Sequence, residues 1–195
     1  MWALYNRALD TSPILTKSFT SFSGFIIGDT LAQVYAGAGR AGGEKFDYGR
    51  TARFAVFGFC IHAPCCHYFY RALDKVVFPL APKSPQAVLA KIAIDQLMWT
   101  PVATVLFYAS LKTMEGEAHK IKETLQEKFV KTLLAGYALW PIAHAINFRF
   151  IPNKQRVLYI NVVQVCWNII LCRIASSSAP VRKSKVEDLE HARSV

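Results

Sequence analysis

Four long stretches without a formal charge recur along this chain and constrain its fold more than any other feature. They cover residues 54–70, 96–111, 132–148 and 157–172, and none of them contains Asp, Glu, Lys or Arg. Such runs are too long for strands and lack the strict apolar–polar alternation of a half-buried strand. We therefore expect an all-α protein.

The length of the runs leaves two environments open. None reaches the roughly 18–20 residues that usually span a bilayer, which by itself favours a soluble helical protein. However, Lys and Arg stand at the run edges, where long side chains can reach the membrane surface, and Trp and Tyr cluster near run ends. These features favour a membrane.

Composition and charge support the same interpretation. The chain is 53% hydrophobic and 18% charged, whereas soluble domains are about 45–50% apolar and about 25% charged. The net charge of +10 suits an anionic membrane surface or nucleic acid. No strongly basic block marks a nucleic-acid-binding face, so we expect membrane lipids and no direct nucleic-acid binding.

The sequence predicts a multi-span transmembrane helical bundle of four to five hydrophobic helices plus one amphipathic surface helix. The first helix is expected over residues 12–36, with Ser12 as N-cap and Pro13 at the first helical position. Gly24 and Gly28 would let a neighbouring helix approach closely. We assign residues 1–175 to one membrane domain and residues 176–195 to a polar, disordered tail.

The amphipathic helix is expected just after residue 114. Ile121, Leu125 and Phe129 recur every four residues there and share one helical face, while Lys and Glu occupy the rest. Such a helix would lie at the membrane surface.

Several polar residues lie inside or beside the apolar segments. Lys91 and Asp95 are four residues apart, so they share a helix face and can pair. One hypothesis is a polar pathway that such residues line or gate, and its members are Asp29, Gln33, Arg53, Lys91, Asp95 and Gln96. The alternative is a set of internal ion pairs that hold the bundle together, for instance Asp29 with Arg53.

The stretch WPIAHAINFRFIP holds a second group of unusual residues. Pro141 should kink or break the helix, and Asn147 needs hydrogen-bond partners in its apolar setting. We interpret this stretch as a tight interhelical joint; the alternative is that Asn147 and Arg149 line a pore mouth.

The cysteines and histidines do not form a recognisable metal or redox motif. His62, Cys66 and His67 lie close together, but a zinc site usually needs two separated ligand pairs, and no CxxC occurs. The sequence also lacks a phosphate-binding loop, a G-x-S-x-G elbow and an H-E-x-x-H motif. We expect packed thiols, no metal, no cofactor and no catalytic residues.

Spaced motifs occur along residues 2–172. They include Gly28-Asp29 with Gln33, Asp47 with Arg50, Arg53 and Gly58, Leu73-Asp74, and Lys91 with Asp95, Gln96 and Pro101. In order and spacing these motifs resemble the 22-kDa peroxisomal membrane protein family, which includes mitochondrial inner-membrane (Mpv-type) relatives. The most specific part is the C-terminal signature, whose residues supply the predicted joint: Trp140, Pro141, Asn147, Pro152, Arg156 and Trp167. At position 144 the family usually has Gln, whereas this chain has His144.

The resemblance implies a small multi-span protein of an organelle membrane. It implies channel-like passage of small solutes, and the solute is not defined. The mitochondrial inner membrane is our first choice of location and the peroxisomal membrane the second. A structural or assembly factor without transport activity is the rival hypothesis, and a homo-oligomer stays open because a small bundle can need partners to enclose a route.

Overall fold

The computed structural model describes residues 1–37 and 45–177, and these form helices without any strand. The first two helices are α1 (Trp2–Thr11) and α2 (Pro13–Tyr35). A long helix follows, in which α3 (Tyr48–Phe57), the π turn η1 (Gly58–His62) and α4 (Ala63–Val76) are continuous. The all-α prediction is confirmed.

The second half of the chain also consists of long helices. α5 (Pro85–Ile94), the π turn η2 (Asp95–Trp99) and α6 (Thr100–Met114) form another continuous helix. The short 3₁₀ turn η3 (Ala118–Lys120) leads into α7 (Ile121–Phe150), and η4 (Asn153–Gln155) leads into α8 (Arg156–Ser177). From residue 178 onward, the predicted tail of 176–195 lies outside the described residues.

Local sequence signals explain where several helices begin. The Asp47 carboxylate accepts a hydrogen bond from the Arg50 backbone N–H (2.8 Å) at the start of α3. The Ser84 hydroxyl accepts one from the Ala87 N–H (3.2 Å) at the start of α5. Ser12 is the N-cap of α2 as predicted, although its side chain makes no capping hydrogen bond.

Each π turn is followed two residues later by a proline, Pro64 after η1 and Pro101 after η2. Proline removes one backbone donor and its ring clashes with the preceding turn of an ordinary α-helix. A π turn has wider i→i+5 spacing and is frequent at functional sites. The two prolines are therefore accommodated where each helix locally widens.

Helix α7 corrects the prediction of a separate amphipathic surface helix. Ile121, Leu125 and Phe129 form the first part of one 30-residue helix that continues through the apolar stretch to Phe150. No Gly or Pro stands between Phe129 and Thr132 to separate the two segments. Pro141 lies inside this helix, which is not broken there.

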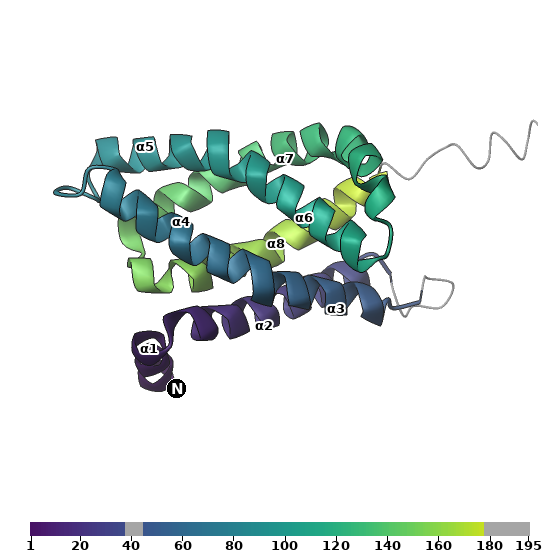
Figure 1. Cartoon of the computed structure of the whole chain (residues 1–195), viewed down its shortest axis with the longest axis horizontal. Helices are drawn as coiled ribbons and strands as arrows, with labels where there is room; N and C mark the ends of the chain where they lie inside the picture. Colours follow the sequence, from purple (N-terminus) through teal and green to yellow (C-terminus); the bar gives the residue numbers. More distant parts are fainter. Residues whose placement is uncertain (38–44, 178–195) are drawn as a thin grey trace, which may run out of the picture.

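Figure 1 shows an elongated bundle in which α2 and α8 run in the same direction and α7 runs back along α5 and α6. A Cβ added to Gly24 would meet the Asn161 Cβ at 3.0 Å, and one added to Gly28 would meet the Asn168 Nδ2 at 2.5 Å. The predicted close approach at these glycines is present, and the partner is α8.

The outside of the bundle is rich in apolar side chains. Two helical segments, Pro85–Met114 and Ala118–Phe150, are long and apolar enough to cross a membrane by length and composition. In each, 17% of the most apolar window is buried in the bundle, so the remaining surface needs another apolar environment. For the other hydrophobic helices, spanning stays a prediction.

Candidate functional site

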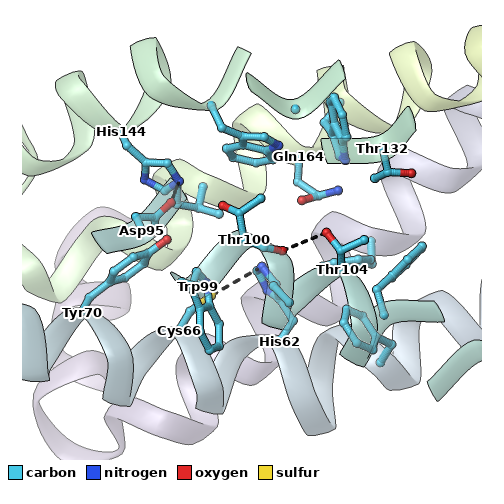
Figure 2. A pocket seen from close by; sticks show the side chains of 18 residues that line it. His62, Cys66, Tyr70, Asp95, Trp99, Thr100, Thr104, Thr132, His144 and Gln164 are labelled. Carbon is cyan, nitrogen blue, oxygen red and sulfur yellow. Dashed lines mark hydrogen bonds and ion pairs between the residues drawn. The ribbon is translucent and has the colours of Figure 1, made fainter. Parts of the chain in front are cut away.

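A cavity of about 130 Å³ lies in the middle of the bundle. Its lining comes from α2, from both helices that contain π turns, and from α7 and α8. Figure 2 shows these side chains from close by. Because one water occupies about 30 Å³ of liquid, the space suits a few waters or a small organic molecule.

Aromatic rings form much of the cavity wall. The rings are those of Phe25, Phe57, Tyr70, Trp99, Phe107, Trp140 and Trp167. Trp140 packs edge to face against Trp167 (ring centroids 6.0 Å apart) and stacks on His144 (5.5 Å). These contacts hold the wall in place, because buried aromatic pairs add stability beyond the area they bury.

The polar part of the lining is uneven. Figure 2 shows Tyr70, Asp95 and His144 together at one end, and Thr104, Thr132 and Gln164 toward the other. Of these, Asp95 carries the formal negative charge, and no Lys or Arg belongs to the described lining.

Asp95 and His144 form a buried pair across two helices. The His144 Nε2 lies 3.1 Å from the Asp95 Oδ2, and the two side chains are 5% and 0% exposed. Asp95 also accepts a hydrogen bond from the Gln96 amide (2.7 Å). The Asp95 Oδ1 and the His144 Nδ1 have no hydrogen-bond partner among the described residues.

The other cavity histidine is held by a sulfur contact. His62 is the last residue of η1, and its Nε2 lies 3.6 Å from the Cys66 Sγ. Within residues 1–37 and 45–170, no three His, Cys, Asp or Glu side chains are grouped closely enough to hold a metal ion.

A second polar cluster lies at the junction of α4, α5 and the start of α8, and Asp74 is its centre. The Asp74 Oδ1 accepts from the Lys91 Nζ (2.6 Å) and from an Arg156 guanidinium N–H (2.9 Å). Its Oδ2 accepts from the Asn153 amide (2.8 Å). Lys91 donates further to the Pro82 carbonyl (2.8 Å). All three charged side chains of this cluster therefore have a partner of opposite charge.

A third polar cluster joins α2 to α3. The fully buried Asp29 makes an ion pair with Arg50 (2.8 Å) and accepts hydrogen bonds from the Gln33 amide (2.8 Å) and the Thr51 hydroxyl (2.7 Å). Gln33 also binds the backbone of Asp47 (2.8 Å from the Asp47 N–H). The cluster fixes the two helices to each other.

Two predicted pairings are wrong. Lys91 pairs with Asp74 and not with Asp95, because its ammonium group donates to the Asp74 carboxylate and the Pro82 carbonyl. The backbone between Lys91 and Asp95 is α-helical, since the Asp95 N–H bonds to the Lys91 carbonyl. Asp29 pairs with Arg50, one turn earlier than Arg53. Arg53 instead lies 3.7 Å from Asp47 and 3.6 Å from Glu115.

The six residues predicted to line a pathway therefore occupy separate places. Asp29 and Gln33 belong to the α2–α3 cluster, Lys91 belongs to the Asp74 cluster, and Gln96 is buried beside Asp95. Of the six, Asp95 lines the cavity. A role in passage or gating stays a prediction for all of them.

The residues of the predicted joint also lie in different parts of the structure. Trp140 and Trp167 line the cavity, whereas Arg156 belongs to the Asp74 cluster and lies over the Phe148 ring (5.3 Å). Pro152 is the N-cap of η4. Asn147 is fully buried, but its amide has no hydrogen-bond partner among the described residues, contrary to our expectation.

Sequence reasoning missed Asp74, Arg50 and Thr51 as centres of polar clusters and His144 as the partner of Asp95. Asp74 and Arg50 do stand in the spaced motifs, which could have singled them out. The His144–Asp95 pair joins α7 to η2, and no spacing of residues along the sequence predicts it.

One group of charges outside the apolar segments pairs locally. Glu117, in the loop between α6 and η3, accepts hydrogen bonds from Lys112 (2.8 Å) and Lys120 (2.5 Å). These hydrogen bonds, that from Lys112 first, lower the pKa of the Glu117 carboxyl to about 2.

Comparisons with known proteins give a consistent result. The sequence profile of the Mpv17/PMP22 family matches residues 112–172. PXMP2/4 family protein 4 of Dictyostelium discoideum is 33% identical over 174 residues, covering 89% of this chain and 92% of that protein. Protein sym1 of Aspergillus oryzae is 34% identical over 90% of this chain and 98% of its own length.

A yeast relative extends the match. Protein SYM1 of Saccharomyces cerevisiae is 30% identical over 188 residues, which cover 94% of this chain and 93% of that protein. No solved structure matches.

Proposed function

Because the chain belongs to the Mpv17/PMP22 family, we propose that it provides weakly selective passage for small metabolites through an organelle membrane. The role requires no catalysis. The mitochondrial inner membrane is the first choice of location, and the peroxisomal membrane is the alternative. Its partners would be membrane lipids and small solutes, and a homo-oligomer could complete the route.

The cavity is the observation that carries this proposal. A sealed helical bundle fills its interior with side chains, because protein interiors pack about as densely as organic crystals. Here about 130 Å³ stays open between all the main helices, and threonine, glutamine, histidine and aspartate side chains face it. Polar groups in a membrane helix usually face protein or water, and a polar cavity inside an apolar exterior supports a route for solutes.

The test is solute release from liposomes that contain the purified protein, with neutral and charged markers of graded size. Ala103 belongs to the lining, so Ala103→Leu places a larger side chain in the cavity and should lower the size limit for release. The matched control is Val102→Leu, one residue earlier, whose side chain is 51% exposed on the outside.

Release with a size limit that falls for Ala103→Leu and not for Val102→Leu would support the proposal. Release no faster than from empty liposomes, with folded and inserted protein, would contradict it.

A second candidate function, a structural or assembly factor, is favoured by the Asp74 cluster. Lys91 and Arg156 are 0% and 2% exposed, and both charges are used to connect helices. A double-mutant cycle on Lys91→Met and Asp74→Asn tests whether this pair serves the fold. A stability coupling of about 0.5–3 kcal/mol with unchanged solute release would assign these charges to structure alone.

A further inference from the structure

We propose that the cavity binds a small primary ammonium ion, with the Asp95 carboxylate as its counter-ion. This inference rests on the proposed passage function, because the site would give that passage its preference among solutes. The geometry points to a cation for three independent reasons, which concern charge, hydrogen bonding and the cavity wall.

The first reason is charge. The Asp95 side chain is 0% exposed, and a buried carboxylate is costly unless a positive group compensates it. The nearest cation along its own helix, Lys91, points to Asp74 and to the Pro82 carbonyl. No Lys or Arg is among the described residues of the cavity wall. The cavity therefore holds an acid without a fixed lysine or arginine counter-ion.

The second reason is the pattern of open hydrogen-bonding atoms. With Asp95 ionised and His144 neutral, the His144 Nε2–H donates to the Asp95 Oδ2, and the His144 Nδ1 is then an acceptor. The Nδ1 and the Asp95 Oδ1 are both unpartnered among the described residues. An ammonium group brings three N–H donors and no acceptor, so it matches a site whose open atoms accept.

The third reason is the wall. Tyr70, Trp99 and Trp140 contribute aromatic rings to the same cavity. Aromatic faces attract cations, and the attraction grows when the site is shielded from water. An anion would meet the Asp95 charge and these aromatic rings without any lysine or arginine to bind. A carboxylate or phosphate is therefore disfavoured.

The size of the cavity limits the ligand. A volume of about 130 Å³ admits an amine with a few heavy atoms and excludes a nucleotide. The site thus predicts that small amines are preferred over neutral and anionic solutes of equal size.

Tryptophan fluorescence can report binding, because three of the four tryptophans line the cavity: Trp99, Trp140 and Trp167. The fourth, Trp2, is 57% exposed on α1 and is removed with Trp2→Phe. The probes are propylammonium, propanol and propionate, which have similar size and differ in charge, titrated into the protein in detergent micelles at constant ionic strength.

We expect saturable binding of propylammonium at least tenfold tighter than of propanol, and no competition by propionate. Asp95→Asn, which keeps the side-chain shape, should weaken propylammonium binding at least tenfold. His144→Gln keeps the carboxylate and should change it less than Asp95→Asn does. The control Asp10→Asn removes an exposed acid that pairs with Lys154, and should have no effect.

Equal binding of propylammonium and propanol, or unchanged affinity in folded Asp95→Asn, would overturn the proposal. If Asp95→Asn does not fold, the ranking of the three probes on the natural sequence decides alone. Liposome release separates this site from the passage function. Amine binding without solute release would support the binding site and contradict the passage function. Release without amine binding or amine preference would support the passage function and contradict the binding site.

Discussion

Asp74 and Asp95 are both enclosed in the same helix bundle, but their surroundings differ. Asp74 is 24% exposed and is bound by Lys91, Arg156 and Asn153. Asp95 is 0% exposed, yet its partners are the Gln96 amide, the His144 imidazole and the Thr100 hydroxyl, and none of them is a lysine or an arginine. The better-compensated carboxylate joins helices, and the less-compensated one faces a cavity. The difference indicates which buried charge serves the fold and which is open to a ligand.

Asp74→Asn should have the largest effect. It would leave the buried Lys91 and Arg156 charges without their counter-ion, and breaking a buried pair in this way costs about 3–5 kcal/mol. Thermal unfolding of the protein in detergent micelles measures the loss. A change no larger than that of Asp10→Asn would mean that the two clusters do not differ as described.

Asp95→Asn should have a smaller effect on stability, within about 1 kcal/mol in either direction. Removing a buried charge that lacks a full counter-charge relieves the cost of desolvation and offsets the weakened contact with His144. The same unfolding measurement serves here. A loss as large as that of Asp74→Asn would show that Asp95 is a structural charge, and the contrast would fail.

A half-buried carboxylate in the loop after α6 provides the smallest effect and a baseline for both. The pairing with Lys112 and Lys120 lowers the pKa of Glu117 from 4.5 to about 2. Its stabilisation is therefore present above about pH 4.5 and declines as the pH falls through about 2.

The difference in unfolding temperature between the natural sequence and Glu117→Gln should shrink over that pH window. A difference that stays constant from pH 6 to pH 2 would argue against the Lys112 and Lys120 contacts.

The sequence predicted the course of the helices better than their contacts. The helix expected over 12–36 is observed as Pro13–Tyr35, and each of the four uncharged runs lies within one continuous helix. Caps, prolines and apolar runs are local signals, so they can be read without a structure. The continuity of α7 was not predicted. Its first part has an amphipathic pattern and its second part is uniformly apolar, which suggested two helices, although no residue between the two parts ends a helix.

Partner choice was less predictable, for a physical reason. The i,i+4 rule places Lys91 and Asp95 on one helix face, and the backbone between them is indeed α-helical, because the Asp95 N–H bonds to the Lys91 carbonyl. The true partners, Asp74 for Lys91 and His144 for Asp95, come from other helices. Such pairs depend on tertiary arrangement, which spacing along one helix does not contain.

The packing of α2 on α8 also has a consequence for biogenesis. The Ser21 hydroxyl and the Asn161 amide that donates to it are 140 residues apart in the chain. At roughly 5–20 residues per second, a ribosome needs on the order of ten seconds to make that interval. During this time the polar face of the first long helix waits for a partner that is not yet synthesised. Another molecule would therefore have to cover that face in the nascent protein until α8 packs against it.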